Sequence, residues 1–313
     1  MQDLNKKAHN PDNFPSRRSF LSTSAVWAAG TIAATTFGGS LLAQNHENPE
    51  KKSDSFQVFD CHLHCPAEAG EKWQWHIVTK NFEEFAAYLD KSGVQRGIIN
   101  SQRSFGASPA EFIAGNREVA RYVDKYKGRF TGACVVNPLF IEESLKEIEY
   151  CHDQLGFVWI GELVNYMIPF DYTVKEFELL VHHATKLNMV LALHTEKGEM
   201  EYIAQKFPNA TIAFAHFGDD HEYDDIFKRI DLVAQNPNYY LDTSGYGHDR
   251  VGVLEYSVEK IGPDRVLFGS DFSINDPSTV IARIKNSFLT TEQKQKIFSG
   301  NLENLLQKVQ IHK

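Results

Sequence analysis

Cysteine and basic charge are both scarce in this chain, and each shortage argues against a class of protein. Only four of the 313 residues are cysteine, and they form no CxxC pair, so a disulfide scaffold is excluded. Lys and Arg total 32 against 41 Asp and Glu, a formal charge of -9, so the chain lacks the basic excess of a nucleic-acid-binding surface. The chain has 42% hydrophobic residues, enough to build the core of one large domain or two ordinary ones.

A pair of arginines followed by an apolar run lies near the N-terminus. The segment Ser16-Arg17-Arg18-Ser19-Phe20-Leu21 precedes an apolar run, Ala25 to Ala43, that glycine and threonine dilute. This pattern resembles a twin-arginine export signal. A membrane anchor is the weaker alternative, because the glycine and threonine residues make the apolar run a poor membrane-spanning helix. We therefore expect residues 1–43 to be an export signal and residues 44–54 a polar linker. The mature protein would be periplasmic without stable membrane insertion, and cleavage of the signal is left open.

From residue 55 onward, short apolar runs alternate with longer segments of helical period. The eight runs are residues 56–64, 94–101, 130–137, 157–164, 189–195, 211–218, 239–244 and 266–272. Segments such as 108–126 and 141–155 carry apolar residues at i, i+3, i+4 and i+7, the pattern of helices that cover a sheet. Residues 55–313 have nearly the ~250-residue length of a (β/α)8 barrel. The sequence thus predicts an α/β fold, a single-domain (β/α)8 TIM barrel.

A doubly wound open sheet is the rival fold, because it shares the βα unit. It normally places a glycine-rich phosphate-binding loop after its first strand. Here that position reads Asp60-Cys61-His62-Leu63-His64-Cys65, without glycine, so the barrel is favoured.

Residues of types that bind metals lie at the carboxyl ends of five of the eight predicted strands, the end where barrel enzymes have their active sites. They are His62 and His64 on the first strand, Glu162 on the fourth, His194 on the fifth, His216 on the sixth and Asp271 on the eighth. Strand side chains alternate, so His62 and His64 should share one face while Cys61, Leu63 and Cys65 point to the helical shell. A lone histidine or aspartate there is more often a hydrogen-bonded rim residue or a cap. Six at one mouth indicate a metal site.

These residues and their flanking motifs resemble the amidohydrolase superfamily, in particular its amidohydrolase-related metal-dependent hydrolases and decarboxylases. The matching motifs are Asp60-x-His62-x-His64, Ala215-His216-Phe217-Gly218 and the run IGPDRVLFGSD from Ile261 to Asp271. The resemblance implies that His62, His64, His194 and Asp271 hold a divalent metal, with zinc the first choice.

The same resemblance gives two roles each to His216 and Glu162. His216 is a catalytic acid/base or polarising group in one-metal relatives and a ligand of the second ion in two-metal relatives. Glu162 matches the bridging carboxylate of two-metal sites, and its alternative is a hydrogen-bond partner that orients His64 or His194. The sequence leaves open whether one or two ions bind.

Metal-dependent hydrolysis is the activity that the resemblance favours. Metal-bound water has a lowered pKa and would attack an amide, ester or lactone, with Asp271 as ligand and general base. The metal, or His216 in a one-metal site, would polarise the substrate carbonyl. The alternative is nonoxidative decarboxylation of an aromatic or unsaturated acid at a one-metal site. A noncatalytic metal-binding protein ranks last, because all six site residues are intact.

Loops at the predicted mouth supply candidate substrate contacts. The four candidates are Arg103, Trp75, Tyr166 and Ser244. Aromatic groups beside one cation suit a ring or an acid-bearing substrate, although Trp75 could simply pack in a lid and Arg103 could pair with a carboxylate. We expect a small-molecule substrate, and the sequence leaves open whether the chain forms a homo-oligomer.

Overall fold

The structure is a computed structural model that describes residues 55–68, 79–106, 108–196, 198–218 and 223–310. The predicted export signal, the linker and Trp75 lie outside these residues and remain predictions. No helix within the described part of the chain has the length and apolar character needed to cross a bilayer.

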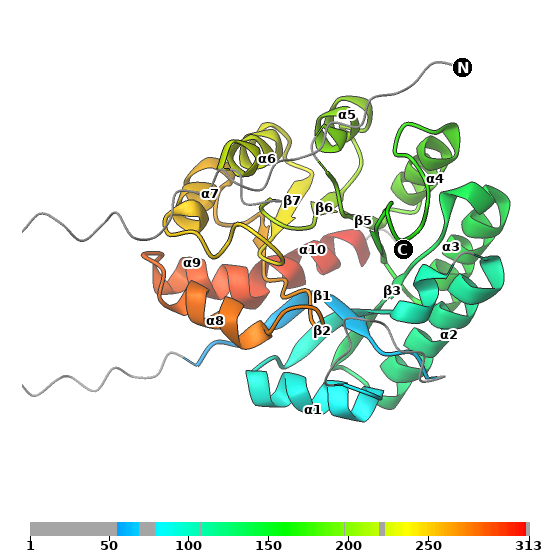
Figure 1. Ribbon diagram of the computed structural model, residues 1–313, viewed down its shortest axis with the longest axis horizontal. Coiled ribbons are helices and arrows are strands. Elements are labelled where there is room, and N and C mark those ends of the chain that lie inside the picture. Colours follow the sequence, from blue (N-terminus) through cyan, green and yellow to red (C-terminus); the bar gives the residue numbers. More distant parts are fainter. Residues whose placement is uncertain (1–54, 69–78, 107, 197, 219–222, 311–313) are drawn as a thin grey trace, which may run out of the picture. The chain divides into compact units, whose positions relative to one another are not determined.

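Eight parallel strands form the centre of the described chain (Figure 1). They are β1 (Phe59–Cys65), β2 (Arg96–Ser101), β3 (Phe130–Cys134), β4 (Trp159–Leu163), β5 (Val190–Leu193), β6 (Ile212–Phe214), β7 (Tyr239–Asp242) and β8 (Val266–Leu267). Each strand pairs with its successor in sequence. The barrel closes because the Cys61 amide donates to the Phe268 carbonyl at 2.9 Å, joining β1 to the end of β8. The predicted (β/α)8 barrel is confirmed.

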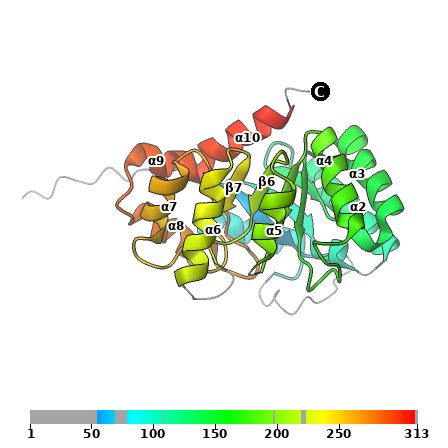
Figure 2. The ribbon, with the colours of Figure 1, turned by 90° about the horizontal axis from the view of Figure 1, so that it is seen from above.

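A layer of helices surrounds the strands (Figures 1 and 2). They are α1 (Phe82–Ser92), α2 (Pro109–Lys125), α3 (Ile141–Leu155), α4 (Lys175–Lys186), α5 (Glu199–Lys206), α6 (Tyr223–Gln235), α7 (Val253–Ile261), α8 (Pro277–Lys285), α9 (Thr291–Gln295) and α10 (Asn301–Gln310). Three short helical turns are η1 (Gln102–Phe105), η2 (Pro138–Phe140) and η3 (Lys296–Gly300). The helices expected at 108–126 and 141–155 are α2 and α3, which begin and end within a residue of the predicted limits.

Apolar side chains form two clusters, one on each side of the barrel wall. The outer cluster packs strand residues such as Ile99 and Leu193 against the surrounding helices. The inner cluster fills the barrel with residues such as Trp159 and Leu267 and includes four residues from α10. These four are Leu302, Leu305, Leu306 and Val309, at i, i+3, i+4 and i+7 of the helix. Figure 2 shows α10 lying across one end of the barrel.

The alternation predicted for β1 is wrong at one position. Cys61 packs in the inner cluster, whereas Leu63 and Cys65 pack in the outer one. The pairing of β1 with β2 is irregular between Asp60 and Leu63, and this shift in register changes the face that the strand presents. His62 and His64 nevertheless reach the same site, as described below.

The ends of β5 and β6 are tied together by one buried side chain of α6, Arg229. One guanidinium nitrogen donates to the carbonyl of Thr195 at 2.8 Å and to its hydroxyl at 3.1 Å. The other donates to the carbonyls of Ala215 at 2.7 Å and His216 at 3.3 Å. Because His194 and His216 project from these strand ends, Arg229 positions two of the predicted site residues.

Replacing Arg229 should destabilise the barrel strongly. In Arg229→Met an unbranched apolar chain replaces the arginine stem but leaves buried carbonyl oxygens without donors, so we expect the free energy of unfolding to fall by about 3 kcal/mol. Denaturant unfolding measures this. The control is Arg121→Met, which removes an exposed pair with Glu68 and should cost less than about 1 kcal/mol. Equal losses in the two variants would contradict the role given to Arg229.

Candidate active site

Four of the six predicted ligands converge on one point at the carboxyl ends of the strands. The Nε2 atoms of His62 and His64 lie 3.1 Å apart. Glu162 Oε2 lies 3.0 Å from His62 Nε2 and 3.4 Å from His64 Nε2. Asp271 Oδ1 lies 3.5 Å and 3.1 Å from the same two atoms. Ligands in a tetrahedron around a metal at about 2.0–2.1 Å are separated by about 3.3 Å, so this spacing fits a metal-ligand set.

The other two predicted ligands lie beside this set. Glu162, His194 and His216 each offer a ligand atom, and these atoms lie within 4.8 Å of one another. Glu162 Oε1 is 3.9 Å from His216 Nε2, while its Oε2 faces His62 and His64. The structure thus brings all six predicted residues together, with Glu162 between the two groups.

The histidine rings are held from behind through their Nδ1 atoms. His62 Nδ1 lies 3.0 Å from Asp242 Oδ2, and His64 Nδ1 lies 2.9 Å from Asn100 Oδ1. An acceptor at Nδ1 fixes the ring and leaves the Nε2 lone pair directed at the metal position. Sequence reasoning missed both partners, although each lies within a strand predicted from the sequence, at 94–101 and 239–244.

Asp242 accepts hydrogen bonds from several parts of the site at once. Its Oδ1 accepts from the backbone amides of His216 at 3.1 Å and Ser244 at 2.9 Å, and from the Ser244 hydroxyl. Burial alone would raise the pKa of Asp242, but the charge and hydrogen bond of His62 outweigh it and lower the pKa to about 2. Asp242 is therefore an ionised acceptor.

The electrostatics of the site favour a bound cation. Burial opposes a charge on His64, yet hydrogen bonds to Asp271 and Glu162 raise its pKa to about 9. Glu162 Oε1 is buried and has no hydrogen-bond partner among the described residues. Buried carboxylates that draw positive charge onto a neighbouring histidine, together with an unsatisfied carboxylate oxygen, fit a divalent ion. The donor set of imidazoles and carboxylates also suits such an ion.

His216 differs from the two histidines of β1. Burial, followed by the charge of His194, lowers the pKa of His216 to about 4, so the ring is neutral at physiological pH. A neutral imidazole keeps one nitrogen lone pair for a ligand or a proton.

Two site residues have a backbone conformation that side chains rarely adopt. His216 has φ 65° and Asp271 has φ 60°, in the left-handed region. Such a conformation costs about 1–3 kcal/mol per residue and persists where surrounding contacts enforce it. The His216 amide donates to Asp242 Oδ1 at 3.1 Å, and the Asp271 amide donates to the His62 carbonyl at 3.0 Å. The strain is thus held by the same residues that build the site.

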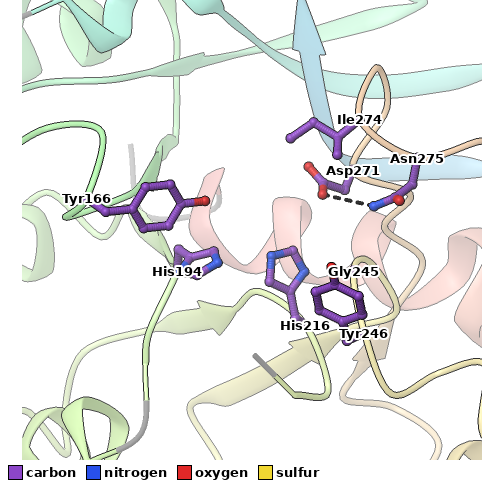
Figure 3. A pocket seen from close by; sticks show the side chains of 8 residues that line it. All are labelled: Tyr166, His194, His216, Gly245, Tyr246, Asp271, Ile274 and Asn275. Carbon is purple, nitrogen blue, oxygen red and sulfur yellow. Dashed lines mark hydrogen bonds between the residues drawn. The ribbon is translucent and has the colours of Figure 1, made fainter. Parts of the chain in front are cut away.

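A cavity of about 340 Å³ opens above these residues (Figure 3). It is lined by Tyr166, His194, His216, Gly245, Tyr246, Asp271, Ile274 and Asn275. Figure 3 shows Tyr166 and Tyr246 on either side of the two histidines. The Asn275 amide donates to Asp271 Oδ2 at 3.1 Å, so the second oxygen of this carboxylate is also fixed.

Of the three predicted substrate residues that the structure describes, one lines the cavity. Tyr166 does so, with its ring edge-on to His194 at 5.2 Å between centroids. Ser244 is fully buried behind the histidines, so a substrate-binding role does not fit its position. Arg103 donates from Nη1 to Glu118 Oε1 at 3.0 Å, the carboxylate pairing that was its alternative. Sequence reasoning missed Asn275 and Ile274 as lining residues.

The fold and the buried imidazole–carboxylate cluster define a barrel enzyme with a site for a divalent metal. A family profile described as Amidohydrolase matches residues 59–307, so the chain belongs to this family and is an enzyme of the amidohydrolase superfamily.

The chain is similar to several decarboxylases. It is 23% identical over 281 residues to the gamma-resorcylate decarboxylase of Polaromonas sp. strain JS666, covering 69% of this chain and 84% of the relative. A dihydroxybenzoic acid decarboxylase structure from Polaromonas sp. JS666, with manganese and 2-nitroresorcinol, matches with TM-score 0.62 and 18% identity, over 80% of this chain and 97% of that one. The 5-carboxyvanillate decarboxylase of Sphingomonas paucimobilis matches with TM-score 0.65 and 15% identity, over 80% and 99% of the two chains.

These comparisons correct the activity expected from the sequence. The hydrolase prediction is wrong, because the curated relative and both of these solved structures are decarboxylases. The predicted superfamily and the predicted divalent-metal site are both supported.

Removing the acceptor of His62 should weaken metal binding. In Asp242→Asn the amide cannot accept from all the donors that surround it, so we expect the metal dissociation constant to rise 10–100-fold. Competition with a chelating dye measures this constant. Asp264→Asn, a surface carboxylate paired with Lys296, is the matched control and should leave it unchanged. An unaltered constant in Asp242→Asn would show that His62 needs no such partner.

Proposed function

We propose that this chain is a metal-dependent nonoxidative decarboxylase of an aromatic acid, in the class of the hydroxybenzoic acids. The observation that carries the proposal is an aromatic-walled cavity whose floor is the imidazole–carboxylate cluster. The tyrosine rings of Tyr166 and Tyr246 and the side chain of Ile274 suit a planar ring, and the cluster below suits the acid group. The decarboxylases to which the chain is similar act on acids of this kind by name.

The metal would be held by His62, His64 and Asp271, with Glu162 and His194, which belong to the neighbouring group of ligand atoms, as further ligands. Glu162 faces the Nε2 atoms, whereas the orienting positions at Nδ1 belong to Asp242 and Asn100 for the two histidines of β1. Such an ion supplies a positive charge that binds a carboxylate and stabilises negative charge on the substrate. Manganese, present in one similar structure, and zinc both accept this ligand set.

The residues of the chain orient the acid and supply a proton. Tyr166 and Tyr246 flank the ring, and the apolar side chain of Ile274 limits access of water. During the reaction the bond between the ring and the carboxylate breaks, carbon dioxide leaves, and the electron pair remains on the ring carbon. Asp271, the carboxylate that lines the cavity, takes up a proton from water and delivers it to this carbon, which forms the new C–H bond. Its Oδ2 is aligned by Asn275.

Decarboxylation is tested directly with metal-loaded protein. With 2,6-dihydroxybenzoate and related hydroxybenzoic acids we expect release of carbon dioxide, and in D2O one deuterium at the carbon that carried the carboxylate. Mass spectrometry of the product measures the deuterium. Removal of the metal by a chelator should abolish turnover, and adding it back should restore turnover. If loaded protein leaves a full panel of aromatic acids unchanged, the proposal fails.

The role of Glu162 is tested by metal content. We expect one ion per chain in the wild type and at least about 10-fold weaker binding in Glu162→Gln, because the amide removes one charged ligand. Elemental analysis and dye competition measure both quantities. Glu68→Gln, an exposed carboxylate, is the control. Unchanged affinity in Glu162→Gln would remove Glu162 from the ligand set, and two ions per chain would make it a bridge instead.

A further inference from the structure

Ser244 connects a histidine of the cavity to the carboxylate of Asp242, whose Oδ1 also accepts from the backbone amides of His216 and Ser244. Its hydroxyl oxygen lies 2.9 Å from His216 Nδ1 and in hydrogen-bond contact with Asp242 Oδ1. The same oxygen lies 3.0 Å from His62 Nδ1. All of these side chains are at least nine-tenths buried, so the contacts are made away from bulk water.

One arrangement of the hydrogen atoms satisfies the contacts of Ser244 with Asp242 and His216 together. A carboxylate accepts and never donates, so the single hydroxyl hydrogen of Ser244 must point to Asp242. The Ser244 oxygen is then only an acceptor toward His216, and the Nδ1 atom of His216 must carry the hydrogen. In a neutral imidazole the other nitrogen, Nε2, then has a free lone pair.

Gly245 leaves no space for another partner beside this nitrogen. A Cβ built on Gly245 would lie 2.2 Å from His216 Nδ1 and 2.6 Å from Cγ of the same ring. The backbone therefore runs directly against the ring, and φ at Gly245 is +58°, a conformation that glycine adopts freely. The Ser244 hydroxyl is the partner that this packing leaves for Nδ1.

We propose that Ser244 is a positioning residue that transmits the acceptor character of Asp242 to His216, holding His216 as the Nδ1–H tautomer with an unprotonated Nε2. His216 lines the cavity, and so the ring offers a substrate or ion an acceptor rather than a donor. A substrate hydroxyl or a cation would be bound there, whereas a substrate carbonyl would not. The assignment concerns the metal-loaded protein without substrate and holds whichever reaction the site performs.

The tautomer can be read without substrate. Protein labelled with 15N-histidine and loaded with diamagnetic zinc gives two-bond 1H–15N correlations that distinguish the Nδ1–H and Nε2–H forms. His216→Gln identifies the signals of this ring. We expect the wild type to show Nδ1–H at His216. The Nε2–H form in the wild type would overturn the proposal without any variant having to fold.

Two further variants separate positioning from packing. In Ser244→Ala the ring loses its acceptor, and we expect the Nε2–H form to gain population and kcat/KM on an aromatic acid to fall about 10-fold or more. Thr243→Val is the matched control, since Thr243 is equally buried but its hydroxyl bonds the backbone of Gly269. The control should leave the tautomer unchanged. An unchanged tautomer in folded Ser244→Ala, or the same shift in Thr243→Val, would refute the role of Ser244.

If decarboxylase activity is not found, the tautomer measurement still stands, because it needs no turnover. If activity is found but His216 is the Nε2–H form, the positioning role alone fails.

Discussion

The carboxylate of Asp242 is the acceptor around which the site is assembled. It lies at the end of β7, 4% exposed, and receives hydrogen bonds from the ring of His62, the backbone of His216 and both the backbone and hydroxyl of Ser244. A buried charge is stable only when it is well satisfied, so these donors cannot be removed one at a time without cost. One group therefore fixes the His62 ring on β1 and the backbone of His216, two residues beyond β6.

The strained backbone at His216 and Asp271 and the buried side chain of Arg229 also serve to hold the site residues in place. The left-handed conformations of His216 and Asp271 turn their side chains into the mouth, and backbone amides bonded to Asp242 and His62 enforce them. Arg229 adds a second level of support by holding the carbonyls at the ends of β5 and β6. At the other end of the barrel, α10 fills the interior with leucine side chains. The barrel is thus packed at one end and polar at the other, and the polar end has room for a ligand.

In the proposed reaction the divalent ion and the substrate share one cavity, and the residues around it have separate tasks. His62, His64 and Asp271 point their ligand atoms at one position, and Tyr166 and Tyr246 form the walls above it. Asp271 belongs to both sets, because it faces His64 through Oδ1 and lines the cavity. Asn275 fixes its remaining oxygen. A carboxylate shared in this way can respond to both the ion and the substrate.

The sequence by itself determined the eight strands, the class of fold and the six residues of the cluster. Apolar runs and helical periodicity are local, and a barrel gathers the carboxyl ends of all its strands, so residues such as Glu162 and Asp271 could be placed together without coordinates. Only the tertiary structure showed which residues hydrogen-bond to the histidines of this cluster. Asp242 and Ser244 meet His62 because β7 and β8 curve round to β1, and the inward position of Cys61 follows from a shift in strand register. Such contacts depend on barrel closure and strand register, which no local sequence pattern encodes.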